Sequence, residues 1–186
     1  MIAFLDFEAS SLSERSYPIE VAWVFEDGAS ETYLIRPAPQ WEDWDPEAEA
    51  IHGISRTELI EHGTGHDEVA WRMIEALTGH DLYVSAPSWD GKWLSTLLRA
   101  TEFPRHALRV KRTDHLLKDT AHQIMARAIH GQKLTDAVDK LLALAKLRDR
   151  QGAPVHRALA DAQDERQRWL NVRAAAEAAL IAGGAR

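Results

Sequence analysis

The stretch MIAFLDFEAS, residues 1–10, is an apolar run that ends in two carboxylates. Side chains alternate between the two faces of a strand, so Asp6 and Glu8 share one face with Ile2 and Phe4. Residues two apart on a strand lie about 7 Å apart, close enough for two carboxylates to repel each other when desolvated and to share a cation. The same spacing also occurs where a strand simply reaches the surface, so the pair alone leaves both interpretations open.

Two more strands are expected directly after this run. Residues 19–25 alternate in the manner of a half-buried strand. Asp27-Gly28 predicts a tight turn, and residues 31–36 are expected to pair back as the other arm of a hairpin. The proline-rich stretch 36–46 is interpreted as a surface loop.

The rest of the chain has mainly helical periodicity, interrupted by two short strands. Ser55 and Glu58 have the spacing of a capping box, and Ser88 is expected to cap the helix that begins there. The predicted helices are a short one after Ser55, then 67–77, 88–98, 114–128, 134–147 and a long one after Pro154, with strands at 82–84 and 108–110. Early antiparallel strands followed by interleaved helices predict an α/β sandwich with a mixed five-stranded sheet flanked by helices.

The composition indicates one domain, residues 1–186. The chain is 45% apolar, and a chain of this size buries about 70% of its extended surface without disulfides or a structural metal. The lack of cysteine excludes a disulfide scaffold, thiolate metal sites and a cysteine nucleophile. The first residues have neither the charges of a signal peptide nor the length of a membrane span, so we expect a cytoplasmic protein with no membrane partner. The formal charge of −7 argues against a protein that coats nucleic acid broadly.

Three distant residues are candidates for the same site as Asp6 and Glu8. Asp161 lies near the start of the last helical pattern, five residues after His156. Five residues correspond to about 140° around a helix axis, so both side chains face one site only if His156 stands in the loop or at the helix entry. Taken singly, His156 also fits an ordinary surface residue, and Asp90 fits an acid that complements the dipole of a first helical turn.

In this order and over this length, these segments resemble the DEDDh group of the DnaQ-like 3′-to-5′ exonucleases, whose fold is the ribonuclease H-like α/β sandwich. Residues 4–12 (FLDFEASSL) are similar to the first exonuclease motif, and residues 156–162 (HRALADA) closely match the third motif in its His-bearing form. Residues 51–55 (IHGIS) resemble the His-Gly-Ile segment between the first two motifs. The second motif departs from the family, because residues 85–90 (SAPSWD) lack the usual His-Asn pair before the aspartate.

The resemblance implies a two-metal site with a histidine base. Asp6, Glu8, Asp90 and Asp161 would hold two Mg²⁺ or Mn²⁺ ions, and His156 would be the general base. The chemistry of these groups agrees, because converging carboxylates repel unless cations neutralise them, and oxygen ligands suit Mg²⁺ or Mn²⁺. Two such ions stabilise both the attacking and the leaving oxygen of a phosphoryl displacement. The implied reaction is metal-dependent 3′-to-5′ hydrolysis of single-stranded DNA or RNA ends that releases nucleoside 5′-monophosphates.

The resemblance also implies contacts with the substrate. The residues concerned are Ala9, Ser10, Leu12, His52 and Trp89. Stacking of Trp89 on a terminal base competes with core packing, which is the more frequent role of tryptophan and the one we expect for Trp23 and Trp71.

Two other functions stay open at this point. One is a catalytically silent ribonuclease H-like module that binds nucleic acid or a polymerase, although the complete set of four acids and His156 counts against it. The other is an exoribonuclease that trims RNA ends. The chain is expected to act alone, as a homodimer or as a dissociable polymerase-associated subunit.

Overall fold

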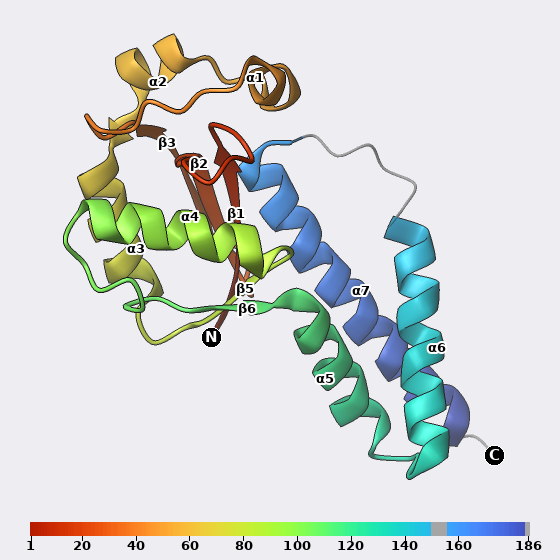
Figure 1. Ribbon diagram of the computed structural model, residues 1–186. Coiled ribbons are helices and arrows are strands. Elements are labelled where there is room, and N and C mark those ends of the chain that lie inside the picture. Colours follow the sequence, from red (N-terminus) through yellow and green to blue (C-terminus); the bar gives the residue numbers. More distant parts are fainter. Residues whose placement is uncertain (150–155, 185–186) are drawn as a thin grey trace.

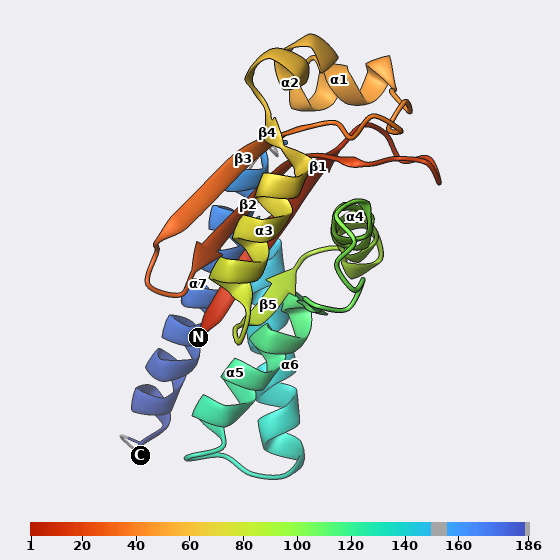
Figure 2. The same ribbon diagram turned by 90° about the vertical axis from the view of Figure 1, so that its left-hand side faces the viewer.

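A mixed six-stranded sheet forms the centre of the protein in the computed structural model, which describes residues 1–149 and 156–184. The strand order is β4-β3-β2-β1-β5-β6; β4 is labelled in Figure 2 and the other strands in Figure 1. The strands are β1 (Ile2–Ala9), β2 (Pro18–Phe25), β3 (Ser30–Arg36), β4 (Thr64–Gly65), β5 (Asp81–Val84) and β6 (Val110–Arg112). The pairs β1–β2 and β2–β3 are antiparallel, whereas β1–β5, β5–β6 and β3–β4 are parallel. The predicted mixed sheet with three leading antiparallel strands is therefore confirmed.

Two details of the sheet differ from the prediction of five strands. β4 is the additional strand, and its two residues are too few to show an alternation in the sequence. The last strand occupies 110–112 and not 108–110, because Leu108 is buried in the core without taking part in the sheet. The turn after β2 is the predicted one, with Gly28 at a φ of 97° that favours glycine.

Seven helices are present in the described residues. They are α1 (Pro46–His52), α2 (Arg56–His62), α3 (His66–Leu77), α4 (Pro87–Ala100), α5 (Thr113–Met125), α6 (Gln132–Asp149) and α7 (Ala158–Gly184). Residues 150–155, which include Gly152 and Pro154, lie outside the described residues. None of the helices in 1–149 and 156–184 combines the length and apolarity that crossing a membrane requires.

The helix starts were predicted with mixed success. The Ser55 hydroxyl accepts the N–H of Glu58, as the capping pattern indicated. The end of the proline-rich stretch is not all loop, because Asp45 caps α1 and Pro46 is its first residue. The predicted Ser88 cap is wrong: α4 begins at Pro87, and the Asp90 carboxylate accepts the N–H of Ala86, 3.1 Å away.

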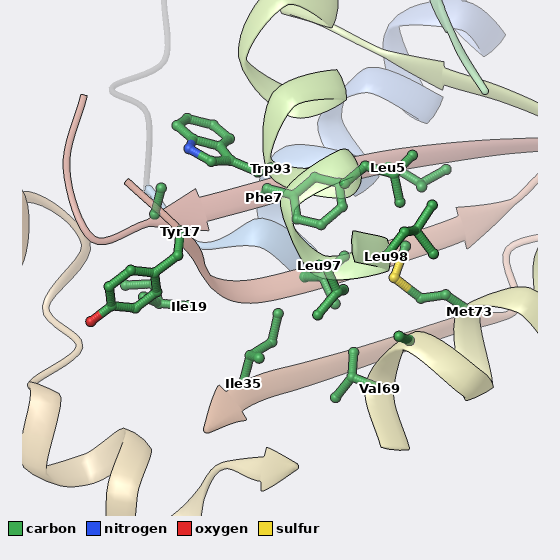
Figure 3. Packing of buried hydrophobic residues seen from close by; sticks show 14 of the residues in the cluster. Leu5, Phe7, Tyr17, Ile19, Ile35, Val69, Met73, Trp93, Leu97 and Leu98 are labelled. Carbon is green, nitrogen blue, oxygen red and sulfur yellow. The ribbon is translucent and has the colours of Figure 1, made fainter. Parts of the chain in front are cut away.

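The two faces of β1 pack against different helices, as the alternation predicted. Leu5 and Phe7 face the cluster that contains Met73 of α3 and Leu97 of α4 (Figure 3). Phe4, on the opposite face, packs with side chains of α5, α6 and α7. Figure 2 shows α7 on the other side of the sheet from α3 and α4. In Figure 1, α7 starts beside the carboxyl end of β1, which is where Asp6 and Glu8 lie.

Two tryptophans expected in the core have different environments. Trp23 on β2 is completely buried and stacks on Tyr33, with ring centroids 5.5 Å apart. Trp71 on α3 is 63% exposed and contacts the edge of Phe103. Its assignment to the core was wrong, because its position on α3 faces away from the sheet.

Candidate active site

Three of the predicted carboxylates meet at the carboxyl end of β1. Asp6 and Glu8 come from this strand, and Asp161 comes from the first turn of α7. One carboxylate oxygen from each lies within 4.8 Å of the other two, and all three residues are partly buried. Residues more than 150 positions apart in the chain therefore form one oxygen-rich cluster.

Asp90 approaches this cluster from α4. The residue is only 2% exposed, and its carboxylate accepts the N–H of Ala86. Burial raises the pKa of Asp6 well above its usual value, and the negative charge of Asp90 is the next largest cause. Asp90 is thus close enough to influence Asp6, although it does not belong to the group of three whose oxygens lie within 4.8 Å.

The cluster is electrostatically unfavourable without a cation. Burial, followed by the charges of Asp161 and Glu20, raises the pKa of Glu8 to about 7. Burial also raises the pKa of Asp90 to about 7, and it raises the pKa of Asp161. Like charges this close resist simultaneous ionisation. Oxygen donors that gain from a nearby positive charge fit a hard divalent cation such as Mg²⁺ or Mn²⁺.

Glu165 is a further acid near the cluster, and the sequence reasoning missed it. It lies on α7 one turn after Asp161, with its side chain 16% exposed. Its charge contributes to the raised pKa of Asp6 and of Asp90. The spacing of four residues from Asp161, which places both on one side of a helix, was the signal that would have identified it.

His156 stands outside the helix, as its spacing from Asp161 required. It precedes α7 by two residues and has a φ of 48°, in the left-handed region that is rare for residues other than glycine. Burial raises the pKa of Asp161, and His156 opposes this rise. The imidazole therefore lies close to the carboxylate cluster.

Glu20 of β2 is the second acid that the sequence reasoning did not single out. It is the cross-strand partner of Glu8 and is 3% exposed. Its carboxylate accepts hydrogen bonds from the Arg157 guanidinium and from the N–H of Ala158. A glutamate in an otherwise apolar strand was the available signal, since a buried acid needs a partner.

The predicted substrate contacts around the loop after β1 differ in accessibility. Leu12 is 70% exposed, whereas Ala9 is buried. Ser10 is completely buried, and its N–H, C=O and hydroxyl all bond within the protein. The hydroxyl donates to Asp43 at 3.2 Å and accepts the N–H of Tyr17 at 3.1 Å.

His52 and Trp89 lie on α1 and α4. His52 is 5% exposed, and its Nδ1 accepts the N–H of Ile54 at 3.1 Å, so the neutral ring carries its proton on Nε2. That Nε2 is buried and finds no hydrogen-bond partner within the described part of the chain. Trp89 stacks on Trp93, with ring centroids 5.6 Å apart, and the Lys92 ammonium lies 5.1 Å from its ring.

Comparisons with known proteins identify the fold. No protein-family model and no curated protein matches the sequence. A structure of exonuclease I from Methylocaldum szegediense aligns over 92% of this chain and 40% of that one, with a TM-score of 0.64 and 20% identity. A zinc-bound complex of Escherichia coli exonuclease I with single-stranded DNA aligns over 95% of this chain and 39% of that one, with a TM-score of 0.61 and 18% identity.

A third similar structure is E. coli exonuclease I with a dT13 oligonucleotide, which aligns over 64% of this chain with a TM-score of 0.52 and 18% identity. The chain spans 40% or less of the length of these three structures. The predicted ribonuclease H-like α/β fold, and with it the predicted likeness to the DnaQ-like exonucleases at the level of the fold, is confirmed.

Proposed function

We propose that residues 1–186 are a single-domain, metal-dependent 3′-to-5′ exonuclease of the DnaQ-like DEDDh type. The observation that carries the proposal is the meeting of Asp6, Glu8 and Asp161 within 4.8 Å, beside His156, on the fold of exonuclease I. The substrate would be a single-stranded DNA or RNA 3′ end, and the product a nucleoside 5′-monophosphate. The exonuclease I structures that bind single-stranded DNA support this class of substrate.

The carboxylates would hold two divalent cations, Mg²⁺ or Mn²⁺. Asp6, Glu8 and Asp161 offer converging oxygens, and Asp90 adds a buried carboxylate next to Asp6. When bound, these cations supply the positive charge that stabilises the oxygens of a phosphoryl displacement. The pKa values of Asp6 and Glu8 are raised first by burial and then by the neighbouring negative charges, and a bound cation offsets both effects.

His156 would accept the proton of the attacking water. A neutral imidazole can accept a proton near neutral pH, whereas a lysine would already be protonated. The location of His156 next to Asp161 also stabilises the imidazolium that forms. The histidine thus both removes the proton and keeps it near a negative group.

The 3′ nucleotide would be held by residues around the cluster. Leu12 is an exposed apolar side chain that follows β1, and His52 has a buried Nε2–H without a hydrogen-bond partner among the described residues. Ala9, Ser10 and Trp89 stay predicted contacts. The predicted homodimer or polymerase-associated subunit likewise stays a prediction, as does the cytoplasmic location.

End-labelled single-stranded DNA and RNA, incubated with and without Mn²⁺, test the activity, its direction and its substrate preference. We expect a metal-dependent ladder that shortens from the 3′ end. Asp6→Ala and Asp161→Ala should abolish cleavage, and His156→Ala should reduce it by about 10²- to 10⁴-fold. Glu8→Gln should weaken Mn²⁺ binding in calorimetry.

Glu177→Gln is the matched control, because Glu177 lies on the same helix as Asp161 but about 24 Å away along its axis. It should leave cleavage unchanged. No metal-dependent cleavage of either nucleic acid would favour the silent binding module. Wild-type rates for His156→Ala would show that another group is the base.

A further inference from the structure

We propose that Glu20 and Arg157 form a latch that positions His156 at the carboxylate cluster. The inference rests on the proposed function, in which His156 is the base. Neither latch residue would touch the substrate. Both would act through the backbone that follows His156.

The Glu20 carboxylate is fully occupied by the start of α7. Its Oε1 accepts from Arg157 Nη2 at 2.7 Å and from Arg157 Nε at 3.2 Å, and its Oε2 accepts from Arg157 Nε at 3.1 Å and from Ala158 N at 2.9 Å. The Glu20 side chain is 4% exposed. Because both oxygens already have donors, Glu20 has no free oxygen for a cation, although it is the cross-strand partner of Glu8. This separates its role from that of the four proposed ligands.

The latch closes on the two residues that follow His156. Arg157 is the next residue, and Ala158 is the first residue of α7. The first N–H groups of a helix have no partner inside it, and an acid at this end also complements the helix dipole. Glu20 therefore caps the N-terminus of α7, although it lies on β2 and not in the segment that directly precedes the helix. The entry of α7 is thereby tied to β2, next to Glu8 on β1.

The backbone of His156 needs such a restraint. Its φ of 48° is disfavoured for residues other than glycine, and such conformations persist only where the surrounding structure imposes them. On the C-terminal side, hydrogen bonds to Glu20 hold the Arg157 guanidinium and the N–H of Ala158. Without them, His156 is expected to relax toward an ordinary conformation and to carry its imidazole away from Asp161.

Steady-state kinetics of Glu20→Gln test the latch. Glutamine keeps the shape but loses the charge that holds the guanidinium and the helix start. We expect kcat to fall about 10- to 100-fold, the loss typical of misplacing a catalytic group, with KM and Mn²⁺ affinity unchanged. In the His156→Ala background, Glu20→Gln should have no further effect on kcat, because a residue that acts through His156 has nothing left to position.

The matched control is Glu31→Gln. Glu31 on β3 also forms a two-pronged ion pair with an arginine, Arg72, with contacts of 2.7 and 2.8 Å. Among the described residues, its carboxylate accepts hydrogen bonds from Arg72 and Tyr33 and not from the start of α7. It should change kcat by less than about twofold in both backgrounds. An equal loss from Glu20→Gln with and without His156 would overturn the latch, and so would an unchanged kcat.

A second measurement does not depend on cleavage. Amide hydrogen exchange at Ala158 and the imidazole signals of His156 are both observable by NMR in the metal-free protein. Glu20→Gln should accelerate exchange at Ala158 at least tenfold and shift the His156 signals, whereas Glu31→Gln should do neither. If the wild type cleaves nothing but these changes occur, the latch stands and the proposed function fails. Unchanged exchange and signals would refute the latch itself.

Discussion

β1 and α7 meet along two stretches of opposite chemistry. At one stretch Phe4 and Trp169 pack with ring centroids 5.8 Å apart, and both are buried. At the other, Asp6 and Glu8 face Asp161. Only eight residues of α7, about 12 Å along its axis, separate Asp161 from Trp169. The same strand and the same helix therefore provide both a hydrophobic contact and a charged cluster.

The difference shows how stability and chemistry are divided within one packing interface. Positions 161, 165, 169, 172 and 176 of α7 lie on one stripe at helical spacing, and the stripe changes from acidic to apolar along the helix. Burial of the apolar part stabilises the fold. The acidic part opposes folding without a cation, as the raised pKa values of Asp6 and Glu8 indicate. Burial of the apolar side chains at one end of the interface thus offsets the electrostatic cost of the carboxylates at the other end.

The largest expected effect comes from Asp6→Asn, which should have opposite consequences for activity and stability. Activity should fall at least about 1,000-fold, because several kcal/mol of charge stabilisation depend on the ligand set. The metal-free protein should become more stable, since one buried negative charge disappears. Cleavage of end-labelled oligonucleotides and thermal unfolding in EDTA measure the two effects.

Glu177→Gln serves as the control for both measurements, because Glu177 is exposed and lies far along α7. A metal-free Asp6→Asn protein that is less stable than the wild type would contradict the division of roles between the two ends.

The sequence allowed the apolar half of this interface to be predicted from local patterns. The apolar run in 2–7 and the alternation in 19–25 identified β1 and β2. The faces of their side chains followed, because successive side chains of a strand point to opposite faces of the sheet. β4 and α1 could not be identified in this way. Two residues carry no period, and the prolines before α1 are equally typical of a loop.

The acidic half was predicted only in part. Asp6, Glu8, Asp161 and His156 were found through motifs, whereas Glu20 and Glu165 were not. The spacing of Glu165 from Asp161 and the apolar surroundings of Glu20 mark both positions in the sequence. Their roles, however, depend on contacts between distant elements, such as the hydrogen bonds that Glu20 on β2 accepts from the start of α7. The left-handed backbone of His156 is likewise a consequence of tertiary contacts.

Trp169→Ala tests the apolar end and should lower the free energy of unfolding by about 3–5 kcal/mol. The loss has two causes: a cavity beside Phe4, and a Thr120 hydroxyl that loses the indole N–H, now 3.0 Å away. Trp169→Phe should cost less, because it keeps most of the ring contact. Urea unfolding measures both variants. If folded Trp169→Ala protein loses its Mn²⁺ affinity at the acidic end, the two ends are coupled and do not act separately.

The smallest expected effect is the pH dependence of the free energy of unfolding, which tests the carboxylate cluster at the acidic end. The pKa of Glu8 is raised from 4.5 to about 7 and that of Asp90 from 3.8 to about 7, so between these values the folded state binds more protons than the unfolded state. Stability conferred by the protonated groups is present below the unfolded pKa and is lost as the pH rises through the folded pKa. In EDTA, the free energy of unfolding should therefore decrease between pH 5 and pH 7.5, by about 1 kcal/mol per pH unit for each proton released.

Mn²⁺ should reverse this decrease, because it stabilises the ionised carboxylates, and Glu8→Gln should flatten the metal-free profile relative to the wild type. Because acids far from position 8 titrate alike in both proteins, the difference between the two profiles reports Glu8 and the nearby acids that its charge affects, such as Asp6. Parallel profiles for the two proteins in urea unfolding would mean that the cluster does not oppose folding.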